Sequence, residues 1–223
     1  MELRLSLFGI HRSIDLSRFT RYRNPLVVLA TAMLALAMTV LLLRPDAVPD
    51  LAHGNVEGAR ALLAGWARGD MIVLVRHVER CDHSSAPCLS GDDDITDRSR
   101  SVAVAVGAQF EQLGLGKADI YNSPMVRTAQ TSGYMFNTVG AGDDWLINCK
   151  GTMLRDALTH KVPGRNLILV THSECMAQLQ KDLKLPISTL GYGASLFVTA
   201  QALQPPHILG LIEASDSQSV TTD

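Results

Sequence analysis

The sequence lacks a strong excess of charge of either sign. Its 223 residues carry a formal net charge of −2, and they contain no internal repeat and no low-complexity tract. Polyanions such as nucleic acids are bound by strongly basic surfaces. The nearly neutral balance therefore gives no indication of a nucleic-acid partner. A chain of this length corresponds to one domain with a short additional segment.

Cysteine is scarce, and no C-x-x-C pair is present. The four cysteines are Cys81, Cys88, Cys149 and Cys175. Without that spacing a zinc site is poorly supported, and we predict no metal. An even number in an oxidising compartment favours disulfides, with three possible pairings, and four free thiols remain the alternative. We predict Cys81–Cys88, which closes a short loop, and Cys149–Cys175, which ties two later segments together.

Charged residues are missing from one stretch near the N-terminus. Residues 25–43 form an apolar run of about 19 residues, which as a helix is long enough to cross a hydrocarbon core of ~30 Å. Arginines precede it, among them Arg12, Arg18, Arg21 and Arg23, and Arg44 alone follows closely. The positive-inside rule then predicts that residues 1–24 are cytoplasmic and that the remainder lies across the membrane.

Two alternatives to a transmembrane anchor remain open. A cleaved signal peptide usually has an apolar region of roughly 7–15 residues followed by small residues at the cleavage site. Residues 41–45 here read Leu-Leu-Leu-Arg-Pro, which favours an uncleaved anchor over a signal peptide. The second alternative is a buried core helix.

The pattern after the anchor predicts an α/β fold. We expect a linker with a packing helix at residues 44–69, a main domain at 70–215 and a flexible tail at 216–223. Apolar runs predict strands at 71–75, 118–121, 145–148, 167–170, 195–199 and 207–212, the last two at sheet edges. Helices are predicted at 56–67, 127–136, 152–159 and 173–183, with another capped by Thr96. This alternation indicates a three-layer sandwich around a mostly parallel sheet.

Basic side chains follow three of these strands. Arg76, His77 and Arg80 come directly after the first strand, Arg127 follows the second, and His172 follows a later one. Ligands of open α/β sheets bind where the strands end at their carboxyl side. Guanidinium groups suit phosphate because their planar fork donates two hydrogen bonds and stays charged. The sequence therefore predicts an anion site with a histidine inside it.

The motifs that carry these residues resemble the histidine phosphatase superfamily, which has the phosphoglycerate-mutase-like fold. Arg76 and His77 match its RH motif, Ser123 and Arg127 match S-x-x-x-R-T, and His172 matches its second histidine. More narrowly, RHVERCD, VRTAQ and TH-x-x-C are similar to the periplasmic lipopolysaccharide core heptose(II)-phosphate phosphatases of Gram-negative bacteria. That likeness extends over roughly residues 70–185.

The resemblance implies an enzyme and a mechanism. It implies a phosphatase that attacks with His77, forms a phosphohistidine and holds the phosphate with Arg76, Arg127 and His172. We further expect Arg80 and Glu79 to contact the substrate. A cage of cationic side chains stabilises the transferred phosphoryl group without a cofactor. The implied setting is an inner-membrane protein with a periplasmic domain, and the implied substrate is a phosphorylated sugar such as lipopolysaccharide core.

The leaving oxygen needs a proton, and three carboxylates are candidates for the donor. Glu174, two residues after His172, resembles the H-x-E proton donor of the acid phosphatase branch and is the first choice. Glu79 is the second, because R-H-x-E occurs in the mutase-like branch, and Asp156 is a distant third.

One departure from the family pattern bears on substrate choice. Val78 stands where relatives carry glycine, and its methyl groups are expected to narrow the approach to the phosphate. Two other functions stay open: a phosphatase of small exported esters, and a phosphate-binding module without turnover.

Overall fold

The computed structural model describes residues 17–42 and 48–216 of the chain. Contacts between residues divide it into two compact units, residues 1–45 and 46–223. The predicted tail lies outside the described residues except for Asp216, and so do residue 43 of the predicted anchor and the first residues of the linker. The predicted domain boundaries stay predictions.

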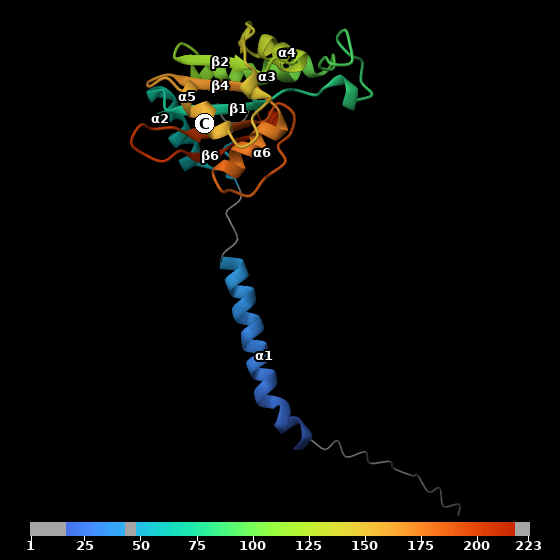
Figure 1. Ribbon diagram of the computed structural model, residues 1–223, viewed down its shortest axis with the longest axis vertical. Helices are drawn as coiled ribbons and strands as arrows, with labels where there is room; N and C mark the ends of the chain where they lie inside the picture. The colour runs from blue at the N-terminus through green and yellow to red at the C-terminus, as the bar shows by residue number, and fades with distance from the viewer. Residues whose placement is uncertain (1–16, 43–47, 217–223) are drawn as a thin grey trace, which may run out of the picture. The chain divides into compact units, whose positions relative to one another are not determined.

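The first unit contains a single described helix, α1 (Ser17–Leu42), drawn in blue in Figure 1. Within it, Pro25–Leu42 has a mean hydropathy of 2.4 and none of it is buried. By length and composition this segment is able to cross a membrane, as a signal sequence near an N-terminus also would be. The choice between anchor and signal peptide therefore stays open.

The second unit is built on one six-stranded sheet. In spatial order the strands are β3 (Ala141–Gly142), β2 (Ala118–Asn122), β4 (Asn166–Thr171), β1 (Met71–Arg76), β5 (Ser195–Thr199) and β6 (His207–Ile212). The pairs β3–β2, β2–β4 and β4–β1 are parallel, whereas β5 is antiparallel to both of its neighbours. The sheet is mostly parallel, as the sequence predicted.

Helices cover both faces of the sheet because its central strands are apolar on both sides. In β1, Val73 and Val75 belong to one core cluster, and Ile72 and Leu74 belong to the other. The first cluster takes side chains from α2 (Val56–Arg68), α3 (Ser99–Leu113) and α4 (Val126–Phe136). The second takes them from α5 (Met153–His160) and α6 (Ser173–Asp182). This arrangement confirms the predicted three-layer sandwich (Figure 1).

Three local predictions were wrong. The run 145–148 is not a strand, because the carbonyl of Asp144 accepts hydrogen bonds from the amides of Ile147 and Asn148 and closes a turn. The strand at 195–199 is not at an edge, because β6 pairs with its outer side. Thr96 does not cap the next helix, which begins at Ser99. The hydroxyl of Thr96 donates instead to the carboxylate of Glu79, shortly after the first strand.

Candidate active site

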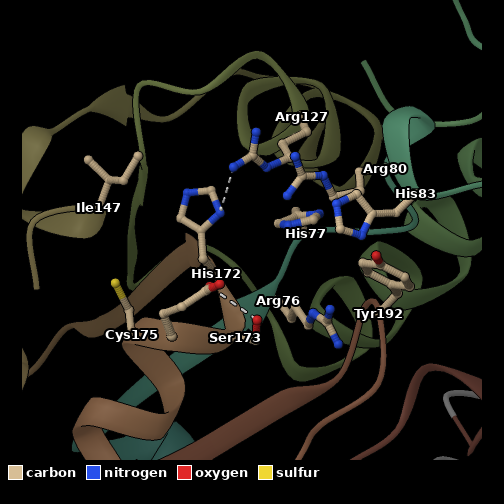
Figure 2. Close-up of a pocket in the computed structure, with 11 residues that line it drawn as sticks. Arg76, His77, Arg80, His83, Arg127, Ile147, His172, Ser173, Cys175 and Tyr192 are labelled. Carbon is tan, nitrogen blue, oxygen red and sulfur yellow. Dashed lines mark hydrogen bonds between the residues drawn. The ribbon is translucent and has the colours of Figure 1, made fainter. Parts of the chain in front are cut away.

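A cavity of about 440 Å³ opens where β1 and β4 end at their carboxyl sides (Figure 2). This is the edge at which parallel sheets bind ligands. Most predicted site residues meet there, although they are far apart in the sequence. The lining residues are Arg76, His77, Arg80, His83, Arg127, Ile147, His172, Ser173, Glu174, Cys175 and Tyr192.

His77 is held in one tautomer by its own backbone. Its ring Nδ1 lies 2.7 Å from the carbonyl oxygen of Val78, which only accepts, so Nδ1 carries the proton and Nε2 has a free lone pair. The main-chain N–H of His77 donates to the carbonyl of Thr171 at 3.0 Å, which links the ends of β1 and β4. Burial, followed by the charges of nearby basic groups, lowers the pKa of His77 to about 3. The imidazole, 3% exposed, is therefore neutral at physiological pH.

Arg76 and Arg127 bring positive charge into the cavity, and each has a hydrogen-bond donor without a partner among the described residues. Nη1 of Arg76 donates to the carbonyl of Leu190 at 2.6 Å, and its guanidinium lies 4.0 Å above the centre of the Tyr192 ring. Among the described residues, the Nε atoms of both arginines are buried without a partner. Burial also lowers the pKa of Arg127. Unpaired buried donors are costly, and an anion bound between them would offset that cost.

Arg80 is oriented by a carboxylate two residues further along the chain. Its Nε and Nη2 both donate to the carboxylate of Asp82, and this paired geometry raises the pKa of Arg80. The pair leaves part of the guanidinium facing the cavity that it lines. Because the fork is fixed before any ligand binds, less side-chain entropy is lost when it accepts one.

His172 is fixed from both sides. Nδ1 lies 3.4 Å from Nη2 of Arg127, which only donates, so Nε2 is the protonated nitrogen and donates to Oγ of Ser123 at 2.7 Å. Oγ of Ser123 lies in turn 3.1 Å from Oγ1 of Thr128. Burial and then the charge of Arg127 lower the pKa of His172 to about 4. The two site histidines meet edge to face, with ring centroids 5.3 Å apart (Figure 2).

Glu174, the preferred acid, lines the cavity from the first turn of α6. Burial acts to raise its pKa, but a backbone hydrogen bond, the hydroxyl of Ser173 at 3.1 Å and nearby positive charge outweigh it, so the pKa of Glu174 is lowered. Glu174 is therefore a carboxylate at neutral pH. Asp156 is not among the lining residues and instead accepts a hydrogen bond from Arg155 at 3.0 Å.

Glu79 does not enter the cavity. Its two carboxylate oxygens accept hydrogen bonds from Arg98, at 2.7 Å from Nε and 2.5 Å from Nη2, and Thr96 donates to it at 2.9 Å. The hydrogen bonds from Arg98 are the largest cause that lowers the pKa of Glu79 to about 2. The expectation that Glu79 contacts substrate is not supported, because these partners hold its carboxylate against the start of α3.

Val78 does not narrow the cavity either. Its side chain is fully buried in the core cluster below α3 and α4 and is not among the lining residues. Successive side chains of an extended segment point in opposite directions, so His77 and Val78 face different ways. The expected restriction of substrate by these methyl groups is therefore wrong.

The sequence patterns predicted no role for Tyr192, which lies in the segment before β5. The side chain lines the cavity, with its ring centroid 5.6 Å from that of His77. Gly191 and Gly193 flank it, and the positive φ of Gly193, 76°, favours glycine. An aromatic residue between two glycines just before a buried strand is the signal that was available.

Both predicted disulfides are present in the structure. Cys81–Cys88 joins Cα atoms 5.4 Å apart in the loop after Arg80, and Cys149–Cys175 joins Cα atoms 5.5 Å apart at the start of α6. Cys175 also lines the cavity. The second bond therefore fixes one wall of the cavity to the turn that precedes α5.

The chain is similar in sequence to curated phosphatases. No family model matches the chain. Lipopolysaccharide core heptose(II)-phosphate phosphatase of Escherichia fergusonii is 31% identical over 115 residues, which are 50% of this chain and 59% of that protein. The protein of the same name from Escherichia coli K12 is 32% identical over 120 residues, 50% of this chain and 57% of that protein. The chain resembles these phosphatases. It spans a little over half the length of these curated relatives.

Solved structures also align with the chain, at low identity. The mycobacterial glucosyl-3-phosphoglycerate phosphatase Rv2419c with VO3 gives a TM-score of 0.47 and 14% identity, and covers 62% of this chain and 96% of that one. The putative phosphohistidine phosphatase SixA from Agrobacterium tumefaciens gives a TM-score of 0.48 and 11% identity. The alignment covers 64% of this chain and 97% of that one.

Proposed function

We propose that this protein hydrolyses phosphomonoesters through a phosphohistidine on His77. The observation that carries the proposal is the tautomer of His77. Its Nδ1–H donates to the Val78 carbonyl, so Nε2 keeps its lone pair, and the ring lines a cavity together with three arginines. A buried neutral imidazole forms no ion pair with the surrounding cations. It is able to act as a nucleophile toward an anion that those cations attract.

The reaction has two steps. Nε2 of His77 attacks phosphorus while the bond between phosphorus and the leaving oxygen breaks. Arg76 and Arg127 stabilise the charge on the equatorial oxygens, and His172 joins them when the bound dianion raises its pKa and Nδ1 takes up a proton. Water then attacks the phosphohistidine, the P–N bond breaks, and inorganic phosphate leaves with the imidazole restored. No step in this scheme needs a metal ion.

Glu174 is the group proposed to move the proton. It protonates the leaving alcohol in the first step and takes a proton from water in the second. Its pKa is lowered, in part because it lies close to positive charge. A bound phosphate dianion neutralises that charge and raises the pKa of Glu174, which makes the protonated form accessible in the complex.

The substrate and location are inferred from the relatives and the N-terminal helix. The relatives are named for the heptose(II) phosphate of lipopolysaccharide core, so we propose a phosphorylated sugar of the cell envelope as substrate. The apolar α1 and two disulfides are consistent with a single-pass inner-membrane protein whose domain lies in the periplasm. A periplasmic protein released by signal cleavage is the alternative.

Turnover tests the catalytic proposal. The full chain in detergent should release phosphate from p-nitrophenyl phosphate, and a chelator should leave the rate unchanged. The variant His77→Ala should release none, whereas the matched control His207→Ala, outside the cavity, should retain the rate. Rapid quenching of the wild type should trap an acid-labile, alkali-stable phosphoryl group on His77. Its absence during steady turnover would overturn the mechanism.

A phosphate-binding module without turnover is the second candidate, favoured by the lowered pKa of the preferred acid. It predicts that phosphate binds to the full chain with no hydrolysis of any ester.

The proposed location is tested separately. A reporter that is active only outside the cytoplasm, fused after Asp223, should be active. Activity of a cytosol-only reporter at the same place would contradict the proposed orientation.

A further inference from the structure

Glu174 belongs to three neighbouring cavities. Besides the catalytic cavity, it lines a second of about 430 Å³ and a third of about 280 Å³. In the proposed reaction the leaving oxygen lies next to Glu174, so the rest of the leaving group extends into one of these two spaces. The side chains of each space decide which chemistry it takes.

The third cavity is mostly apolar and reaches away along α6. Met176, Ala177, Ile187 and Leu190 contribute to it, with Ser173, Ser188 and Thr189 at its polar margin. It has no cationic side chain among its lining residues. A polyhydroxylated leaving group would lose hydrogen bonds to water there without replacing them, which costs free energy for each unpaired hydroxyl.

The second cavity, called the polar cavity below, is lined mainly by polar residues, although more of its surface is apolar than polar, and it adjoins the catalytic one. Asn148, Lys150 and Gln178 line it, and Ile147 and Glu174 are shared with the catalytic cavity. Figure 2 shows Ile147 and Cys175 on the side of the catalytic cavity away from Tyr192. The polar cavity therefore extends from that side.

The walls of the polar cavity are fixed in place. The disulfide Cys149–Cys175 joins the loop of Asn148 to α6, and the amide of Asn148 donates to the carbonyl of Asp144 at 2.9 Å. On α6, Nε2 of Gln178 donates to Asp182 at 2.6 Å, which leaves the amide oxygen of Gln178 available as an acceptor. A site with rigid walls loses little entropy when it binds a ligand.

Lys150 supplies a positive charge that the protein itself does not neutralise. It is exposed, and among the described residues it forms no ion pair and no side-chain hydrogen bond. In the proposed reaction, the phosphate at the catalytic centre already has three arginines around it. A further cation beyond Glu174 is therefore placed to meet a second negative charge on the same substrate.

We propose that the cavity lined by Asn148, Lys150 and Gln178 is the leaving-group subsite, and that Lys150 selects polyol phosphates bearing a second anionic group. The inference rests on the proposed phosphatase function and names its substrate class. Asn148 and Gln178 hydrogen-bond the hydroxyls, and Lys150 pairs with a phosphate or carboxylate at the far end. The subsite acts on binding, so it changes KM and leaves the chemistry at His77 unaltered.

Three substrates with the same carbon chain test this. Glucitol 6-phosphate, 6-phosphogluconate and glucitol 1,6-bisphosphate carry a hydroxyl, a carboxylate or a second phosphate at the far end. For the full chain in detergent at low salt, KM should be lower for the two doubly charged substrates. Lys150→Ala should raise those two KM values about three- to fivefold, with kcat unchanged, and added salt should shrink the difference. The carboxylate and bisphosphate arms show which anion is preferred.

Controls separate this inference from the catalytic proposal. Lys150→Arg should restore the preference, and Lys117→Ala, at the opposite end of the strands, should not change it. p-Nitrophenyl phosphate, which has no second anion, should be hydrolysed equally by the wild type and Lys150→Ala. Equal KM values for the three substrates, or equal losses on all substrates including p-nitrophenyl phosphate, would overturn the subsite while leaving the phosphatase function standing. If the wild type hydrolysed none of these esters, the proposed phosphatase function itself would be refuted.

Discussion

Oγ of Ser123, at the end of β2, lies 2.7 Å from Nε2 of His172, at the end of β4. These strands are neighbours, so the sheet itself brings the hydroxyl to the ring. Because Oγ of Ser123 accepts a hydrogen bond from Nε2–H, Nδ1 stays unprotonated and faces Arg127 and the cavity. We therefore treat Ser123 as a positioning residue that acts through His172.

The variant Ser123→Ala should lower kcat/KM about tenfold, which corresponds to the loss of one hydrogen bond worth ~1.4 kcal/mol. The reason is that His172 is no longer held in one tautomer. Steady-state kinetics with p-nitrophenyl phosphate measures the effect. Ser101→Ala, whose hydroxyl donates to the main-chain carbonyl of Arg98 just before α3, is the control. A wild-type rate in Ser123→Ala would contradict the positioning role.

Glu174→Gln should slow hydrolysis of esters with poor leaving groups much more than esters with good ones, because only the former need a proton donor. The expected difference is about a hundredfold between glycerol phosphate and p-nitrophenyl phosphate. Rates on a graded series of aryl and alkyl phosphates measure it. Equal slowing across the series would exclude Glu174 as the acid.

The pH profile on glycerol phosphate should rise toward acid. The pKa of Glu174 is below its usual value in the free protein, so its protonated fraction near neutral pH is small and grows about tenfold for each unit of pH decrease. His77, with a pKa of about 3, remains neutral and nucleophilic over that range. The ratio of kcat/KM between the wild type and Glu174→Gln, which cancels the ionisation of the substrate itself, should increase from pH 7 to pH 5. A flat ratio would count against this assignment.

Glu79→Gln should affect stability more than catalysis. The pKa of Glu79 is lowered to about 2, so its ion pair with Arg98 stabilises the fold above the unfolded-state pKa and loses that effect as pH falls from about 4.5 to 2. The variant should have a lower Tm at pH 7, a smaller deficit near pH 3, and kcat within about threefold of wild type. Calorimetry at several pH values measures this, with Glu111→Gln as an exposed control. A large loss of kcat at unchanged Tm would return Glu79 to the list of acids.

The two disulfides should contribute unequally. Cys149–Cys175 spans 26 residues and Cys81–Cys88 spans 7, so a chain-entropy estimate assigns them about 3.5 and about 2.4 kcal/mol. Replacing Cys149 and Cys175 together by serine should therefore lower the urea midpoint more than replacing the other pair, and it should also raise KM, because this bond holds a cavity wall. The opposite order of midpoints would show that native-state contacts outweigh loop closure.

The sequence by itself determined the scaffold of the site. Short apolar runs predicted β1, β2 and β4, and basic residues at their ends predicted that Arg76, His77, Arg127 and His172 would meet. This worked because side-chain periodicity is a local property and parallel strands bring their carboxyl ends to one edge. The two disulfides that were favoured among three possible pairings are also present.

Only the tertiary structure decided how each group is used. Glu79 lies two residues from His77 but accepts hydrogen bonds from Arg98, just before α3, whereas Tyr192 lines the cavity from a loop more than a hundred residues away. The tautomers of His77 and His172 depend on a neighbouring carbonyl and a distant hydroxyl. Hydrogen-bond partners and burial are set by elements far apart in the chain, so no local pattern of residues specifies them.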